Sequence, residues 1–198
     1  MRFLALGDSY SVGEAVDSSE RWPERVAVML RTRGLDLGVP QIIAQTGWTT
    51  DDLAAGIAAA APAAPYDIVS LLIGVNNQYR GRSAEDYRAG FRSLLAHAIA
   101  LAGARARRVI VVSIPDWGVT PFAEGRDRSG ITAAIDRFNA IGREEADAAG
   151  ARFADITPAS RERSEGWVAR DGLHPSGAQY ERWAGVLLPV FSAAMREE

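Results

Sequence analysis

Short apolar segments alternate with longer segments of helical character along the whole chain. Apolar runs of strand length lie at residues 2–6, 41–46, 66–74, 107–115 and 151–157. Between and after them, apolar residues spaced by three and four positions, with start and stop signals, predict helices at residues 23–34, 49–61, 83–103, 130–150 and 176–198. The chain therefore repeats a strand-then-helix unit five times.

The predicted helix at residues 83–103 has the clearest pattern. Ser83 and Asp86 have the spacing of a capping box, with Asp in place of the usual Glu or Gln. The last helix is expected to bend near Pro189, because proline lacks the N–H that a helix interior uses. Residues 66–74 are apolar nearly throughout, which is typical of a strand buried on both faces.

This alternation predicts the α/β class. Short strands separated by amphipathic helices indicate a three-layer αβα sandwich of about five parallel strands with helices on both faces. No internal repeat, low-complexity segment or linker interrupts the pattern, so we expect one domain over residues 1–198. The longest irregular regions, 115–129 and 157–175, follow strands and should lie at the carboxyl edge of the sheet, where open α/β folds bind ligands.

Charge and composition narrow the possible partners. The net charge is −3, which argues against nucleic acid because phosphate binding requires a basic surface. The absence of cysteine excludes disulfides and thiolate metal sites, and two histidines are too few for a histidine-rich metal site. We expect neither a metal nor an organic cofactor. Of the histidines, His97 falls within a predicted helix, and a structural or surface role is favoured there.

No apolar stretch approaches the ~18 residues needed to cross a bilayer. The N-terminal run leads directly into Gly-Asp-Ser without a small-residue cleavage site, which favours a structural strand over a signal peptide. A cytoplasmic location is expected unless a leader was removed. The pattern leaves the oligomeric state open.

Candidate catalytic residues stand at three strand ends and in one loop. Ser9 lies in "GDSYS" after the first strand, and His174 and Asp171 lie in "RDGLH" before the last helix. A serine hydroxyl becomes a useful nucleophile when a base takes its proton, and imidazole titrates near neutral pH. Asp171 precedes His174 by three residues, so a tight turn can bring its carboxylate to the imidazole.

Attack on an ester carbonyl creates an oxyanion, which requires positioned hydrogen-bond donors. The candidates are the backbone N–H groups of Ser9 and Gly47 and the side-chain amide of Asn76. Gly47, in "QTGWTT", lets a substrate approach its backbone closely. Asn76, in "GVNN", offers N–H donors without a charge.

These four blocks, in this order, resemble those of the SGNH (GDSL-type) hydrolase family, and the resemblance runs from residue 7 to residue 174. "RWPERVAVML" also resembles the small esterase and lysophospholipase-like members. The family implies a flavodoxin-like fold, a Ser-His-Asp triad and three oxyanion donors. The resemblance implies that Ser9 is the nucleophile and first oxyanion donor, and that Gly47 and Asn76 are the other two donors. It also implies that His174 is the base and that Asp171 orients it.

Two positions depart from the family pattern. Asn77 stands where an aspartate is usual, and we expect altered local hydrogen bonding with intact chemistry. Tyr10 replaces a usual leucine and should change the shape of the substrate pocket. Asp8 is adjacent to the nucleophile, so a loop-organising role is expected for it rather than that of triad acid.

Aromatic residues follow two of the blocks. Trp48 and Tyr79 either form a wall of the acyl or alcohol pocket or only pack its rim, and the sequence does not favour one over the other. Asp116 and Trp117, after the fourth strand, are similarly placed, with weaker support.

The sequence thus predicts a serine esterase that hydrolyses small carboxylic esters, for example short acyl (acetyl) esters of carbohydrates, through an acyl-enzyme. Alternatives with the same fold are a lysophospholipase, a thioesterase, or a catalytically silent binding module, for which Asn77 is the sole support. A nucleotide-binding flavodoxin-like protein ranks last, because no glycine-rich phosphate motif follows a strand.

Overall fold

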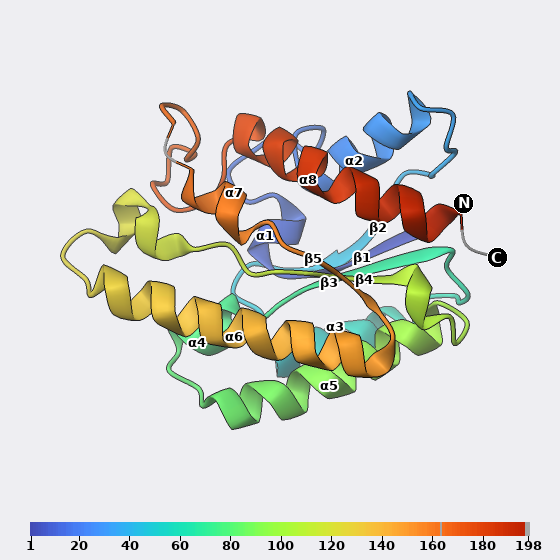
Figure 1. Ribbon diagram of the computed structural model, residues 1–198, viewed down its shortest axis with the longest axis horizontal. Helices are drawn as coiled ribbons and strands as arrows, with labels where there is room; N and C mark the ends of the chain where they lie inside the picture. The colour runs from blue at the N-terminus through green and yellow to red at the C-terminus, as the bar shows by residue number, and fades with distance from the viewer. Residues whose placement is uncertain (163, 197–198) are drawn as a thin grey trace.

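A sheet of five parallel strands forms the centre of the molecule (Figure 1). We describe it from a computed structural model, in which residues 1–162 and 164–196 are described. The strand order is β2-β1-β3-β4-β5. The strands are β1 (Phe3–Gly7), β2 (Gln41–Ala44), β3 (Ile68–Leu72), β4 (Val109–Val112) and β5 (Arg152–Ala154).

The longer helices follow the strands as the sequence predicts. They are α2 (Trp22–Arg31), α3 (Thr50–Ala60), α5 (Ala84–Leu101), α6 (Arg128–Ala149) and α8 (Gly177–Met195). Shorter helices that no periodicity revealed are α1 (Ser9–Val12), α4 (Val75–Tyr79), α7 (Thr157–Arg161) and the 3₁₀ turns η1 (Ala106–Arg108), η2 (Trp117–Val119) and η3 (Pro121–Ala123). A run of three to five residues is too short to show a helical repeat.

Helices cover both faces of the sheet, which confirms the three-layer αβα sandwich. Figure 1 shows α2 and α8 on one face and α3, α5 and α6 on the other. On the first face, Phe191 packs edge-on against Phe3 of β1 and against Trp22 of α2. On the second, Tyr87 of α5 stacks on Phe138 of α6, with ring centroids 4.4 Å apart.

Local sequence signals set the helix ends. Thr49 and Asp52 form a complete capping box at the start of α3, and the Ser83 hydroxyl accepts a hydrogen bond from the Asp86 N–H at α5. Pro189 lies inside α8, which continues as one helix from Gly177 to Met195. No helix among residues 1–162 and 164–196 is long and apolar enough to cross a bilayer.

The strand order locates the functional edge of the sheet. The chain passes from β1 outward to β2 and then returns to β3 on the other side of β1, so the direction of winding reverses between β1 and β3. In open α/β sheets, ligands bind beyond the carboxyl ends of the strands at this reversal. Ser9 follows β1 and Asn76 follows β3, so both residues lie there.

Candidate active site

A small cavity lies at this edge and brings together segments from the whole length of the chain. Its volume is about 170 Å³. It is lined by Ser9, Tyr10, Thr46, Gly47, Val75, Asn76, Tyr79, Trp117, Phe122, Leu173 and His174.

Ser9 is held at the tip of a tight turn between β1 and α1. Asp8 caps α1, with its Oδ1 accepting a hydrogen bond of 3.0 Å from the N–H of Tyr10. A Cβ atom added at Gly7 would lie 2.6 Å from the carbonyl oxygen of Leu72 in β3, so glycine lets the turn pass close to that strand. Ser9 becomes the first residue of the helix and is 5% exposed.

Asp8 itself is completely buried. Its second oxygen, Oδ2, has no hydrogen-bond partner within the described part of the chain. Burial raises the pKa of Asp8 to about 7, although the hydrogen bond from Tyr10 works in the opposite direction. The cap is the loop-organising role that the sequence predicts for Asp8.

The two candidate oxyanion donors other than Ser9 lie in the turn after β2 and at the start of α4. Gly47 has a φ of +86°, which favours glycine, and its carbonyl accepts a 2.7 Å hydrogen bond from Nη2 of Arg80. Asn76, the second residue of α4, donates one amide N–H to the carbonyl of Trp48 at 2.9 Å. Gly74, with a φ of +127°, turns the chain from β3 into α4.

His174 and Asp171 form a pair through a tight turn. Nδ1 of His174 lies 2.6 Å from Oδ2 of Asp171, and Asp171 Oδ1 accepts the backbone N–H groups of Leu173 and His174 at 2.9 and 3.0 Å. Burial opposes ionisation of Asp171, but these hydrogen bonds outweigh it and lower its pKa.

The loop that carries His174 is well supported. Val168 and Pro175 form an antiparallel bridge, and the His174 carbonyl accepts a hydrogen bond from Ala169 at 2.8 Å. The Tyr10 ring packs edge-on against the imidazole, with centroids 5.6 Å apart. Ser9 and His174 line the same cavity, and no hydrogen bond joins their side chains in the described structure.

Asn77 lies outside the cavity and is 1% exposed. Its Oδ1 accepts the N–H of Thr50 at 3.1 Å and its Nδ2 donates to the Thr50 hydroxyl at 2.8 Å. A carboxylate could only accept at this position, so asparagine changes the direction of one hydrogen bond and removes a buried charge. It ties α4 to the start of α3 without altering the residues that line the cavity.

The aromatic candidates differ in their placement. Tyr10 and Tyr79 line the cavity, whereas Trp48 does not. The Trp48 ring packs over Gly56 of α3, where an added Cβ would lie 2.2 Å from a ring carbon, and the Trp48 carbonyl accepts a hydrogen bond from Asn76. Of the two roles that the sequence leaves open for Trp48, these contacts favour packing at the rim. His97 is exposed on α5, in agreement with a surface role.

Several lining residues were not identified from the sequence. Phe122 and Leu173 come from the irregular regions 115–129 and 157–175, whose position at this edge was predicted correctly, but which have no periodicity to single out a side chain. Thr46 and Val75 are direct neighbours of the predicted donors. Adjacency to those blocks is the signal that could have found them.

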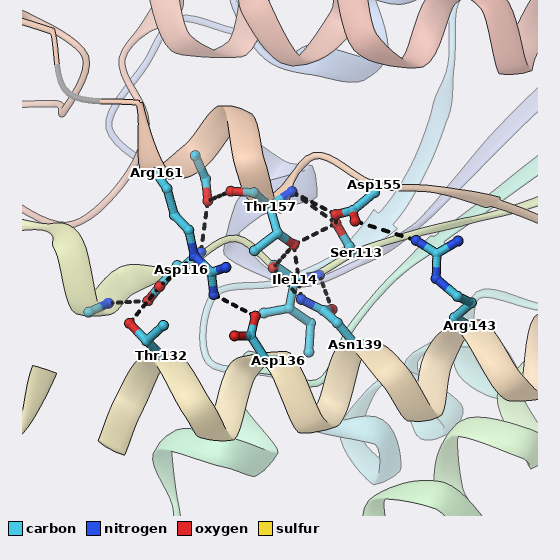
Figure 2. A network of polar contacts seen from close by, with 12 residues as sticks. Ser113, Ile114, Asp116, Thr132, Asp136, Asn139, Arg143, Asp155, Thr157 and Arg161 are labelled. Carbon is cyan, nitrogen blue, oxygen red and sulfur yellow. Dashed lines mark hydrogen bonds and ion pairs between the residues drawn. The ribbon is translucent and has the colours of Figure 1, made fainter. Parts of the chain in front are cut away.

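A network of polar contacts fixes the segment that carries Trp117 (Figure 2). The carboxylate of Asp116 is buried and accepts hydrogen bonds from the Gly118 N–H at 2.8 Å, the Thr132 hydroxyl at 2.7 Å and Nε of Arg161 at 2.9 Å. These bonds join the segment after β4 to both α6 and α7. Asp116 is thus a structural anchor of the cavity wall.

The indole of Trp117 is fixed as well, since its Nε1 donates to Oε1 of Gln78 at 2.8 Å. Trp117, Tyr10 and Leu173 also form part of a second, larger cavity of about 440 Å³. That cavity reaches Asp116 but does not include Ser9 or His174.

The chain belongs to the GDSL-like lipase/acylhydrolase family, whose model matches residues 5–182. By class the protein is an ester hydrolase. No curated protein matches the chain.

Solved structures confirm the fold. TesA superposes with a TM-score of 0.76 at 20% sequence identity, over 98% of this chain and 99% of that chain. A member of the lipolytic G-D-S-L family from Veillonella parvula gives a TM-score of 0.76 at 19% sequence identity, over 97% of this chain and 98% of that chain. The acetylxylan esterase Axe2 from Geobacillus stearothermophilus gives a TM-score of 0.69 at 20% sequence identity, over 100% of this chain and 94% of that chain.

Proposed function

We propose that the protein hydrolyses small carboxylic esters through an acyl-enzyme formed on Ser9. The observation that carries the proposal is the pair formed by His174 and Asp171. Oδ2 of Asp171 lies 2.6 Å from Nδ1 of His174, and His174 lines the same cavity as Ser9. Because Nδ1 is engaged by the carboxylate, Nε2 is the nitrogen left to accept the serine proton.

In the first step, the Ser9 hydroxyl attacks the ester carbonyl carbon while its proton passes to His174. The resulting imidazolium is stabilised by the carboxylate of Asp171. Collapse of the tetrahedral intermediate breaks the bond to the alcohol oxygen, which takes the proton from His174. The acyl group remains on Ser9 Oγ.

The oxyanion of the intermediate is stabilised by hydrogen bonds from the backbone N–H groups of Ser9 and Gly47 and from the Asn76 amide. The hydrogen bond to the Trp48 carbonyl uses one of the two Asn76 N–H groups, so the second is available for substrate. Water then repeats the sequence with His174 as base, releasing the acid and restoring Ser9.

Short acyl groups suit the cavity best. Its volume of about 170 Å³ is below the ~300 Å³ of pockets that enclose drug-sized ligands. Acetyl esters, including those of carbohydrates, are the substrates that we favour. A structural relative, Axe2, is an acetylxylan esterase. A long-chain lysophospholipase or thioesterase has less support, because a long acyl chain would have to leave this cavity, and the larger cavity that shares its wall does not include Ser9 or His174.

The test is hydrolysis of p-nitrophenyl esters from acetate to octanoate by the wild type and Ser9→Ala. We expect the highest kcat/KM with acetate, and a fall in kcat of roughly 10⁴-fold or more in the variant with the circular dichroism spectrum retained. Activity of folded Ser9→Ala near that of the wild type would refute the mechanism. A preference for octanoate would refute the short-acyl assignment alone.

A further inference from the structure

Three aromatic rings form a cluster at the mouth of the catalytic cavity, and an arginine lies over them. The centroid of Trp117 lies 5.5 Å from that of Tyr79 and 6.0 Å from that of Phe122. The guanidinium carbon of Arg126 lies 4.9 Å from the Phe122 centroid and 5.7 Å from each of the other two. We call these four residues the aromatic–arginine cluster.

Two of the three rings and Arg126 are open to solvent, whereas the Trp117 ring is buried beneath them. Tyr79 is 49% exposed and Phe122 is 37% exposed, and these belong to the few large apolar side chains on the described surface. Exposed apolar groups that form one contiguous patch beside a cavity are typical of a ligand-binding surface. Tyr79, Trp117 and Arg126 also line a shallow depression next to the cavity, so the surface from Ser9 to Arg126 is continuous.

Arg126 has no anionic partner among the described residues. Its guanidinium makes the three ring contacts and no hydrogen bond or ion pair in that part of the chain. The nearby arginines differ, since Arg128 donates to the Gly118 carbonyl and Arg161 binds two carboxylates. The adjacent carboxylate of Asp127 caps α6 through Gly130 and Ser129 instead.

The contacts of Phe122 tie the cluster to the loop that carries His174. Its N–H donates to the carbonyl of Gly172 at 2.9 Å, so the ring belongs to a segment bonded to the loop of His174. In the proposed mechanism His174 gives its proton to the leaving alcohol. In that mechanism we expect the alcohol portion of the substrate to lie nearest to this loop.

We propose that the aromatic–arginine cluster is a subsite for the alcohol portion of the substrate, and that it selects an alcohol with a flat apolar body ending in a carboxylate. This assignment rests on the proposed function. The rings would pack against the flat body. The guanidinium of Arg126, which has no anionic partner in residues 1–162 and 164–196, presents a planar fork of donors that matches a carboxylate in two parallel hydrogen bonds, and its contact with the rings holds the fork in place.

The test compares two acetate esters that differ by one carboxylate, phenyl acetate and 4-acetoxybenzoate. Intrinsic reactivity cancels when the ratio of their kcat/KM values is compared between variants. We expect Arg126→Ala to lower the ratio of anionic to neutral substrate by roughly tenfold to a hundredfold, the loss typical of a hydrogen bond to a charged group. The ratio in Arg126→Lys should lie between those of the wild type and Arg126→Ala, because lysine keeps the charge but not the planar fork.

The matched control is Arg33→Ala, which removes the same charge from an exposed position between α2 and β2, at the opposite edge of the sheet. Its ratio should equal that of the wild type. An equal ratio in Arg126→Ala and the wild type, or an equal fall in both variants, would overturn the subsite.

A binding measurement separates this inference from the catalytic proposal. Calorimetric titration with 4-hydroxybenzoate, the product alcohol, needs no turnover. Binding that weakens at least tenfold in Arg126→Ala supports the subsite even if the wild type hydrolyses neither ester, a result that would refute the proposed function alone. Equal affinity in the two proteins would overturn the subsite whatever the activity.

Discussion

Replacing Asp8 by asparagine should change how the stability of the protein depends on pH. Asp8 is fully buried, one of its oxygens has no partner among the described residues, and burial raises its pKa from 3.8 to about 7. In the unfolded chain the carboxyl loses its proton near pH 4, whereas in the folded protein it keeps the proton until about pH 7. The folded state therefore binds the extra proton between these values.

The direction of this pH dependence follows from the difference in bound protons between the folded and unfolded states. Where the folded state binds more protons than the unfolded state, the free energy of unfolding falls as pH rises. The contribution of Asp8 is most favourable below pH 4, decreases through the window up to about pH 7, and is constant above it. Each unit of pKa difference is worth roughly 1.4 kcal/mol, so the contribution of Asp8 to the free energy of unfolding changes by about 4 kcal/mol across this window.

The assay is urea unfolding of the wild type and Asp8→Asn at several pH values from 4 to 8. Asparagine does not titrate, and it can keep the cap on the Tyr10 N–H. The free energy of unfolding of the wild type minus that of the variant should fall by about 4 kcal/mol across this range, while any constant cost of the substitution cancels. A difference that stays constant with pH would refute the buried, proton-retaining Asp8.

Two further predictions concern the catalytic groups. Asp171→Asn should lower kcat for p-nitrophenyl acetate by roughly 10⁴-fold. An amide N–H that donates to Nδ1 of His174 places the ring proton on Nε2, which then cannot accept the Ser9 proton. A loss below tenfold would contradict the role of Asp171. Arg80→Ala should lower kcat by about tenfold with little change in KM, because the 2.7 Å hydrogen bond that fixes the Gly47 carbonyl is lost. Arg82→Ala, which breaks an exposed ion pair with Asp51 and leaves the Arg80–Gly47 hydrogen bond in place, is the matched control. Equal losses in both variants would contradict a specific role for Arg80.

The fold could be predicted from the sequence because local and global signals agree. Each strand is a short apolar run, and caps such as Thr49 and Ser83 start helices where the periodicity changes. Once the strands are known to be parallel, their carboxyl ends must meet at one edge. That geometry is why residues as distant in sequence as Ser9 and His174 could be expected at one cavity.

The walls of the cavity could not be predicted in the same way. The segment of Trp117 and Phe122 is shaped by 3₁₀ turns and by the bonds of Asp116 to α6 and α7, which join positions far apart in sequence. The orientation of Trp48 depends on the close approach that Gly56 allows in α3, which adjacency to Gly47 does not reveal. Contacts of this kind are set by tertiary packing and leave no periodic signal.

The central claim is that Ser9 is a nucleophile activated by His174. Its most direct measurement is the mass of the protein and of its Ser9 peptide after reaction with a fluorophosphonate, which transfers its phosphonyl group to an activated serine hydroxyl with loss of fluoride. We predict one adduct, located on Ser9, that is absent in Ser9→Ala and forms much more slowly in His174→Ala. A folded wild-type protein that acquires no adduct on Ser9 would contradict the account.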